Sequence, residues 1–131
     1  MTDETPKGEA TLRTVAMPAD VNVNGDIFGG WVLSQMDIAS GIIASERAQG
    51  RVTTVAVDAM KFIRPVQVGD ILSVYAYLEQ VGNTSMVVGL EAWALRRMGG
   101  AVEKVTEGRF TFVAIDTDGR PRPVPKPVPK A

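Results

Sequence analysis

The stretch DVNVNGDIFGGW, which begins at Asp20, has the spacing of oxygen-bearing side chains that opens a calcium-binding EF-hand loop. Asp20, Asn22 and Asn24 stand where such a loop places ligands, and Gly25 stands where it makes its sharp turn. The last ligand of an EF-hand loop is a bidentate glutamate, and the residue at that place here is Trp31. The calcium-module hypothesis therefore fails at a ligand that supplies two of the oxygens, and no metal site is expected.

A single carboxylate, Asp37, lies in the apolar run that follows Gly29 and Gly30. On a helix, Ser34 and Asp37 fall on one narrow stripe beside a broad apolar face. A carboxylate next to the core is costly to desolvate, so Asp37 is either paired and structural or tuned for general-base chemistry. The residues alone leave these two alternatives open.

Gly29 and Gly30 stand at the predicted start of this helix. The first backbone N–H groups of a helix have no partner within it, and the positive end of the helix dipole attracts negative charge. Because glycine allows close approach to the backbone, one N–H, that of Gly30, is a candidate oxyanion donor. The alternative is that the two glycines form only a flexible turn.

Composition excludes several classes of function. The 131-residue chain has 14 basic and 15 acidic residues and a formal net charge of −1, so it has no bulk attraction for nucleic acid or an anionic membrane. It has no Cys and no His, which excludes a thiol nucleophile, a histidine base and a thiolate or imidazole zinc site. The N-terminus lacks the layout of a signal peptide and no long apolar span is present, so we expect a cytoplasmic protein.

The hydrophobic pattern predicts one helix among five strands. The helix is expected over residues 28–49, ending at Gly50. A hairpin turn is expected at residues 82–85. The expected strands span residues 11–17, 52–62, 71–81, 86–97 and 105–116.

These elements form one expected domain, residues 11–118, between a flexible N-terminus, residues 1–10, and a proline-rich C-terminal tail, residues 119–131. The order β-α-β-β-β-β with short turns predicts an α+β fold, in which a curved antiparallel sheet wraps around one long buried helix. One helix cannot cover all of the apolar surface of the sheet. Edge strands and exposed apolar side chains such as Trp93 therefore predict self-association.

Three segments of the chain resemble one known family. They are AMPADVNVNGDIFGGWVLSQMDIASGIIA (16–44), RVTTVAVDAMKFIRPVQVGD (51–70) and FTFVAIDTDGRPRPVPK near the end. Together they are similar to the hotdog-fold acyl-CoA thioesterases, in particular the small bacterial YciA-like enzymes. The resemblance implies a hotdog fold and hydrolysis of fatty acyl-CoA to free acid and coenzyme A.

The resemblance also implies catalytic roles. Asp37 matches the acidic residue that acts as general base or nucleophile toward the thioester, and Gly30 matches the oxyanion donor. Asp26 matches a position that is Asn or Asp in relatives and acts across a dimer interface, where it would orient water or the thioester; its alternative role is an N-terminal cap. Asp20 and Asn24 fit turn or cap roles, although Asn24 is kept as a substrate contact.

Coenzyme A brings phosphates, so basic residues are expected at the mouth of the site. Arg96, Arg97 and Arg109 are further candidates, and each is better explained as a plain surface charge. The expected substrate-binding residues are Asn24, Gly29, Ser34, Lys61, Arg64 and Ser85. No cofactor is expected beyond the coenzyme A of the substrate, and the resemblance implies a dimer of hotdogs assembled as a homohexamer, a trimer of dimers.

Two rival functions belong to other classes. Hotdog-fold dehydratases and hydratases usually use a histidine, which this chain lacks. A non-catalytic acyl-CoA-binding sensor would keep the pocket and lose the base, whereas this chain retains Asp37.

Overall fold

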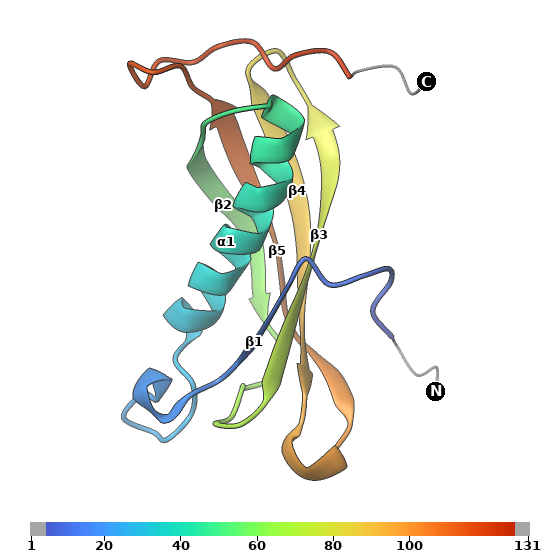
Figure 1. The fold of residues 1–131 in the computed structure, drawn as a ribbon. Helices are drawn as coiled ribbons and strands as arrows, with labels where there is room; N and C mark the ends of the chain where they lie inside the picture. Colours follow the sequence, from blue (N-terminus) through green and yellow to red (C-terminus); the bar gives the residue numbers. More distant parts are fainter. Residues whose placement is uncertain (1–4, 128–131) are drawn as a thin grey trace.

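One long helix lies against one face of a five-stranded antiparallel sheet in the computed structural model (Figure 1). The structure describes residues 5–127, and for Met98 it describes the backbone alone. The outermost residues of both predicted terminal segments, 1–4 and 128–131, lie outside the described residues. The elements in chain order are β1 (Leu12–Val15), the 3₁₀ turn η1 (Pro18–Asp20), α1 (Gly29–Ala48), β2 (Val52–Phe62), β3 (Ile71–Val81), β4 (Ser85–Leu95), the 3₁₀ turn η2 (Arg97–Gly99) and β5 (Val102–Ala114). The predicted order and the hotdog architecture are confirmed.

The strands lie in the order β1-β3-β4-β5-β2, and every neighbouring pair is antiparallel. The helix connection therefore takes the chain from one edge strand, β1, to the opposite edge strand, β2. The register of β2 against β5 shifts twice, between Thr54 and Ala56 and between Asp58 and Lys61. Such bulges bend an edge strand and redirect its side chains.

Alternate side chains of β4, the central strand, form part of the hydrophobic core. Met86, Val88 and Leu90 point toward the helix and are at most 2 % exposed. They pack in one cluster with buried helix residues that include Met36 and Ala39. The sheet face that β4 turns toward α1 is therefore the inner face, and the other is the outer face.

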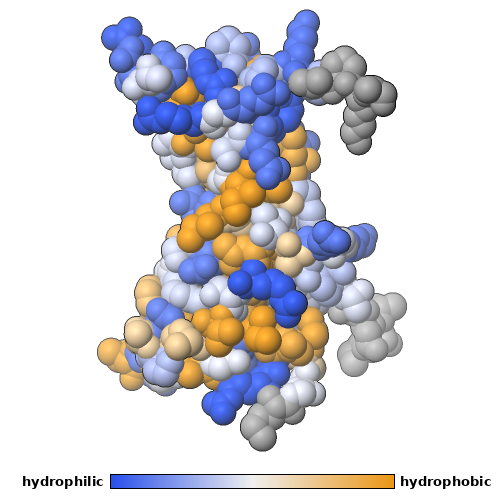
Figure 2. All heavy atoms as spheres, in the orientation of Figure 1, coloured by the Kyte–Doolittle hydropathy of each residue, from blue (hydrophilic) through white to orange (hydrophobic). Residues whose placement is uncertain are grey.

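The helix is buried on one side only, contrary to the prediction of a wholly buried helix. Ile38 and Ile42 are 52 % and 39 % exposed, and the edge strand β2 exposes Val55 and Val57. Figure 2 shows hydrophobic side chains in a diagonal band across the middle of the face on which α1 lies. Because one chain leaves this apolar side of the helix in water, the surface is suited to a partner.

Two further expectations need correction. Trp93, which was expected to be exposed, lies on the outer face but is only 3 % exposed, and its indole N–H donates to Glu91 Oε1 at 3.0 Å. The N-terminal residues Pro6 and Ala10 line a cavity together with Trp93, so the N-terminal segment lies over this part of the sheet. The last strand begins at Val102, three residues earlier than predicted.

The described part of the proline-rich tail packs against the domain. Arg122 Nη2 donates to the carbonyl of Ala48 at the end of α1 at 2.9 Å, and the N–H of Val124 donates to the carbonyl of Asn83 at 2.7 Å. Val124 is half-buried against the core. Within residues 5–127, no helix combines the length and the apolar run that a membrane crossing needs.

Candidate functional site

The helix begins without a side-chain cap. Phe28 is the N-cap residue, with φ −72° and ψ 146°, and it makes no side-chain hydrogen bond to the first turn. The N–H of Phe28 donates to the carbonyl of Asp20 at 3.1 Å, and the N–H of Trp31 donates to the carbonyl of Phe28 at 3.1 Å. Within residues 5–127, the N–H groups of Gly29 and Gly30 have no acceptor. The predicted pair of free donors is therefore present, and the cap role considered for Asp26 is wrong.

The polar loop before the helix is held by Asn22. Its Oδ1 accepts the N–H groups of Asn24 at 2.9 Å and Asp26 at 3.2 Å, and its own N–H donates to the carbonyl of Asp26 at 2.7 Å. This Asx turn directs the Asn22 oxygen toward the backbone, so the oxygen is engaged where an EF-hand would turn it toward a cation. The carboxylate of Asp20 accepts the N–H of Met17 at 3.3 Å, which is a role inside the turn and not at the helix start.

A hollow of about 320 Å³ opens beside the helix start. Three of the predicted residues, Asp26, Gly29 and Arg64, line it, together with Phe62 at the end of β2. Arg64 is held in place, since its Nε lies 3.2 Å from Glu103 Oε2 and its Nη1 donates to the carbonyl of Lys104 at 2.8 Å. The hollow thus combines a carboxylate, a guanidinium and the free end of a helix, which suits a polar, partly anionic ligand.

Asp37 lies in the middle of α1 and is exposed in the single chain, contrary to the expected position beside the core. Its Oδ1 accepts the hydroxyl of Thr54 on β2 at 2.7 Å. Ser34, one turn earlier, is also exposed, and its hydroxyl donates to the carbonyl of Trp31 at 2.7 Å. Thr54 was not predicted as a site residue, because its contact with Asp37 depends on how the helix and the strand align in space.

Gly30 and Asp37 are not brought together within one chain. Seven residues of helix separate them, which at a rise of 1.5 Å per residue is about 10 Å along the axis. The N–H groups at the helix start point away from the rest of the helix, and therefore away from Asp37. One chain does not offer both groups at about 3 Å from one reacting carbonyl, which is what joint action on it requires.

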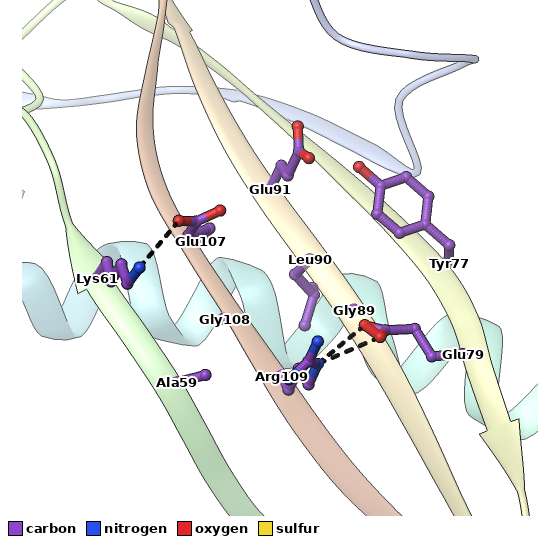
Figure 3. A pocket seen from close by; sticks show the side chains of 10 residues that line it. All are labelled: Ala59, Lys61, Tyr77, Glu79, Gly89, Leu90, Glu91, Glu107, Gly108 and Arg109. Carbon is purple, nitrogen blue, oxygen red and sulfur yellow. Dashed lines mark hydrogen bonds and ion pairs between the residues drawn. The ribbon is translucent and has the colours of Figure 1, made fainter.

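Lys61 lies on the outer face of the sheet, where Figure 3 shows it with the helix behind the strands. Its Nζ is 4.0 Å from Glu107 Oε1, and Arg109 Nε is 3.2 Å from Glu79 Oε2 across the outer face of β4. A cavity of about 290 Å³ lies among these charges. Lys61 and Arg109 thus already have acidic partners, and they face away from Asp37.

Two residues that line that cavity, Tyr77 and Glu107, have shifted pKa values. Burial and the adjacent Glu91 raise the pKa of Tyr77 to about 12. The hydrogen bond from Lys104 lowers the pKa of Glu107, and its effect exceeds the opposite effect of burial. Both shifts come from neighbours on the outer face, and neither group belongs to the hollow at the helix start.

The remaining predicted contacts are dispersed. Ser85 begins β4 at the β3–β4 hairpin, which lies near the C-terminal end of α1 in Figure 1 and thus far from Gly29. Asn24 is exposed in the loop and does not line the hollow. Arg97 lies against Gly69.

Arg96 is a structural residue in this chain. Its Nη1 lies 2.6 Å from Asp70 Oδ2 and its Nε lies 3.1 Å from Glu103 Oε1. Burial by itself lowers the pKa of Arg96, but the hydrogen bonds that Arg96 donates to Asp70 and Glu103 outweigh it and raise the pKa above its ordinary value. Arg96 is therefore committed to an ion pair that ties β4 to the loop before β3.

Comparisons with known proteins agree with this architecture. The pattern of the Thioesterase superfamily matches residues 24–101. The Acyl-CoA thioester hydrolase YciA of Salmonella typhimurium is 52% identical over 126 residues, which cover 94% of this chain and 95% of that protein. The hexameric thioesterase y2039 from Yersinia pestis superposes with a TM-score of 0.88 at 50% identity, covering 94% of this chain and 100% of that one. Cj0915, a hexameric hotdog fold thioesterase of Campylobacter jejuni, superposes with a TM-score of 0.85 at 42% identity, covering 90% of this chain and 91% of that one.

Proposed function

This chain belongs to the Thioesterase superfamily, and we propose that it hydrolyses acyl-CoA thioesters to free acid and coenzyme A. The substrate class is supported by the name of the Salmonella relative, which is similar over nearly the whole chain. The observation on which the mechanism rests is an exposed carboxylate, Asp37, fixed in the middle of the helix by a hydrogen bond from Thr54. A thioester carbonyl is electrophilic enough for a carboxylate, a water molecule and an oxyanion donor to suffice.

In the proposed reaction Asp37 acts as general base or as nucleophile toward the thioester carbonyl. The charge that develops on the carbonyl oxygen is stabilised by the free N–H of Gly30. Asp26, in the hollow beside Gly29, orients the water or the thioester. No metal or cofactor takes part, so treatment with a chelator is expected to leave turnover unchanged.

Each proposed site is shared between two chains. The separation of about 10 Å along the helix prevents Gly30 and Asp37 of one chain from acting on one carbonyl, so we place Gly30 of one chain opposite Asp37 of a second copy. The exposed side of α1 at Ile38 and the exposed edge strand β2 are suited to that copy. The Yersinia and Campylobacter thioesterases are described as hexameric, which supports further assembly of these dimers as a trimer of dimers.

Arg64 is the proposed contact for the phosphates of coenzyme A, because it lines the hollow at the helix start together with Gly29. Its salt bridge with Glu103 orients the guanidinium and leaves the side chain 46% exposed. Asn24, Ser34, Lys61 and Ser85 stay predictions as substrate contacts, since they are dispersed over the single chain.

A thiol-release assay with acyl-CoAs of several chain lengths tests this function. We expect turnover with at least one of them and none with the amide analogue of the same substrate. The alternative, an acyl-CoA-binding sensor, predicts binding by calorimetry without release of thiol from any of them. Light scattering on the same preparation tests the assembly, for which a species larger than a dimer is expected.

A further inference from the structure

Four side chains of alternating charge form a row that ends at the hollow beside the helix start. Asp70 Oδ2 accepts a hydrogen bond from Arg96 Nη1 at 2.6 Å, and Arg96 Nε donates to Glu103 Oε1 at 3.1 Å. The second carboxylate oxygen of Glu103 lies 3.2 Å from Nε of Arg64, which lines the hollow. The exposure of the four side chains rises along the row, from 2% at Asp70 through 18% and 37% to 46% at Arg64. A buried carboxylate is thus connected to the guanidinium proposed as the contact for the phosphates of coenzyme A.

Glu103 is held at both of its oxygens, which distinguishes its pair with Arg64 from an ordinary surface ion pair. Water screens an ordinary surface pair, and two long free side chains rarely keep one geometry. Here Arg96 is fixed by the buried Asp70 and also donates to the carbonyl of Pro65 at 3.0 Å. Pro65 directly follows Arg64, so the same anchor locates the backbone of Arg64 and, through Glu103, its side chain.

Arg64 keeps donors for a ligand in this arrangement. A guanidinium carries five N–H donors. Nη1 donates to the carbonyl of Lys104 at 2.8 Å and Nε is directed at Glu103, while Nη2 makes no hydrogen bond within residues 5–127. Because the side chain is fixed before a ligand arrives, it loses little conformational freedom when it binds a phosphate.

We propose that Glu103 is a positioning residue that makes the site selective for thioesters of coenzyme A. The substrates it selects against carry the same acyl group on pantetheine, which is the thiol arm of coenzyme A without the nucleotide and its phosphates. This inference rests on the proposed function, in which Arg64 contacts those phosphates. Glu103 is bound to Arg64 and Arg96, whereas Asp37 is bound to Thr54 on β2, so the effect of Glu103 is on binding of the nucleotide and not on the thioester.

Glu103→Gln tests this role with two substrates that share one acyl group. The amide has the shape of the carboxylate, but its NH₂ group accepts no hydrogen bond, so one of the two arginines loses its acceptor. With acyl-CoA we expect KM to rise about 3- to 10-fold and kcat to stay within about twofold, because the loss is one of binding. With S-acyl-pantetheine both constants are expected to stay within about twofold of wild type.

Glu79→Gln is the matched control. It makes the same change in another Arg–Glu pair, with Arg109 on the outer face, and the Glu79 side chain is 36% exposed against 37% for Glu103. The two variants therefore lose the same charge at similar exposure, and only one of them loosens Arg64. Glu79→Gln is expected to behave as wild type with both substrates.

A double-mutant cycle shows whether Glu103 acts through Arg64. Arg64→Met should raise KM for acyl-CoA, and Glu103→Gln should have little further effect in that background. An equal further rise would overturn the inference, as would an equal rise of KM for both substrates in Glu103→Gln alone. A wild-type KM for acyl-CoA in Glu103→Gln would also overturn it, and a lower KM would show that Glu103 competes with the phosphates for Arg64.

Calorimetry with adenosine 3′,5′-bisphosphate separates failure of this inference from failure of the proposed function. If wild type releases no thiol from any acyl-CoA, the proposed hydrolysis fails, but binding of the bisphosphate still reports on Arg64 and Glu103. We expect Glu103→Gln to weaken this binding about 3- to 10-fold and Glu79→Gln to leave it unchanged. Equal affinity in wild type and Glu103→Gln would overturn the role of Glu103, and equal affinity in Arg64→Met would remove the phosphate contact together with it.

Discussion

Gly30 and Asp37 lie on the same side of α1, two helical turns apart. Gly30 offers its N–H toward the helix start, whereas Asp37 is fixed beside β2 through Thr54. Each group is available, but one chain does not present both to one carbonyl. The proposed second copy would account both for the separation of these two groups in one chain and for the exposed apolar side of the same helix.

Complementation between two inactive variants tests the shared site. Asp37→Ala lacks the base, and Gly30→Pro lacks the N–H, since proline has no backbone donor and is tolerated in the first turn of a helix. If Gly30 of one chain works with Asp37 of another, a mixed dimer has one intact site. Random mixing makes half of the dimers mixed, so activity should return to about a quarter of the wild-type value.

The matched control is Gly30→Ala, which keeps the N–H. Its methyl group would lie 3.0 Å from the ring of Phe28, an exposed side chain that has room to move. Gly30→Ala is therefore expected to retain more activity than Gly30→Pro. The proline variant removes one oxyanion donor, and its kcat is expected to fall about 100- to 1000-fold. Mixed variants that stay inactive after subunit exchange would place each site within one chain.

Breaking the ion pair of Arg96 with Asp70 should lower the free energy of unfolding more than breaking the exposed pair of Arg109 with Glu79. The side chain of Asp70 is only 2% exposed, so Arg96→Met leaves a buried carboxylate without its cation. We expect a loss of about 3–5 kcal/mol in the free energy of unfolding, measured by urea denaturation.

Arg109→Met is the control, because its pair with Glu79 has side chains 57% and 36% exposed. Breaking this surface pair should cost less than about 1 kcal/mol. Equal losses for the two variants would contradict the structural role assigned to Arg96.

Tyr77 should make the protein sensitive to alkaline pH. Burial and Glu91 raise its pKa from the ordinary 10.0 to about 12, so the folded state keeps the phenol proton longer than the unfolded state does. The stability that this gives is complete below pH 10 and is lost as the pH rises toward 12. The free energy of unfolding of Tyr77→Phe should therefore fall less over this range than that of wild type.

Glu91→Gln provides a second variant for the same effect. Without the neighbouring carboxylate, the phenolate absorbance of Tyr77 should appear at lower pH than in wild type. Parallel unfolding curves for wild type and Tyr77→Phe through the alkaline range would contradict this explanation.

The fold was predictable because local patterns and the global fold agree. β2 and β3 were predicted at their observed bounds, and α1 within one residue at each end, since glycines and turn residues mark these boundaries. Trp93 was wrongly predicted to be exposed, because period-two alternation cannot show that the N-terminal segment covers it.

The site was only partly predictable. The free donors of Gly29 and Gly30 follow from the rules of helix ends, and the structure also brings Asp26 and Arg64 to that end. Lys61 illustrates the limit, because a bulge between Asp58 and Lys61 alters the alternation that would tell which face it occupies. Thr54 was missed for a related reason, since no sequence spacing reports which strand residue meets Asp37.

The most direct test of the account is the rate of thiol release by Asp37→Asn in single turnover with saturating acyl-CoA. The amide has nearly the shape of the carboxylate and can still accept the Thr54 hydroxyl, but it cannot take a proton or attack the thioester. We predict binding within about threefold of wild type and a rate lower by at least about 100-fold. A wild-type rate in Asp37→Asn would contradict the assignment of Asp37 as the reacting carboxylate.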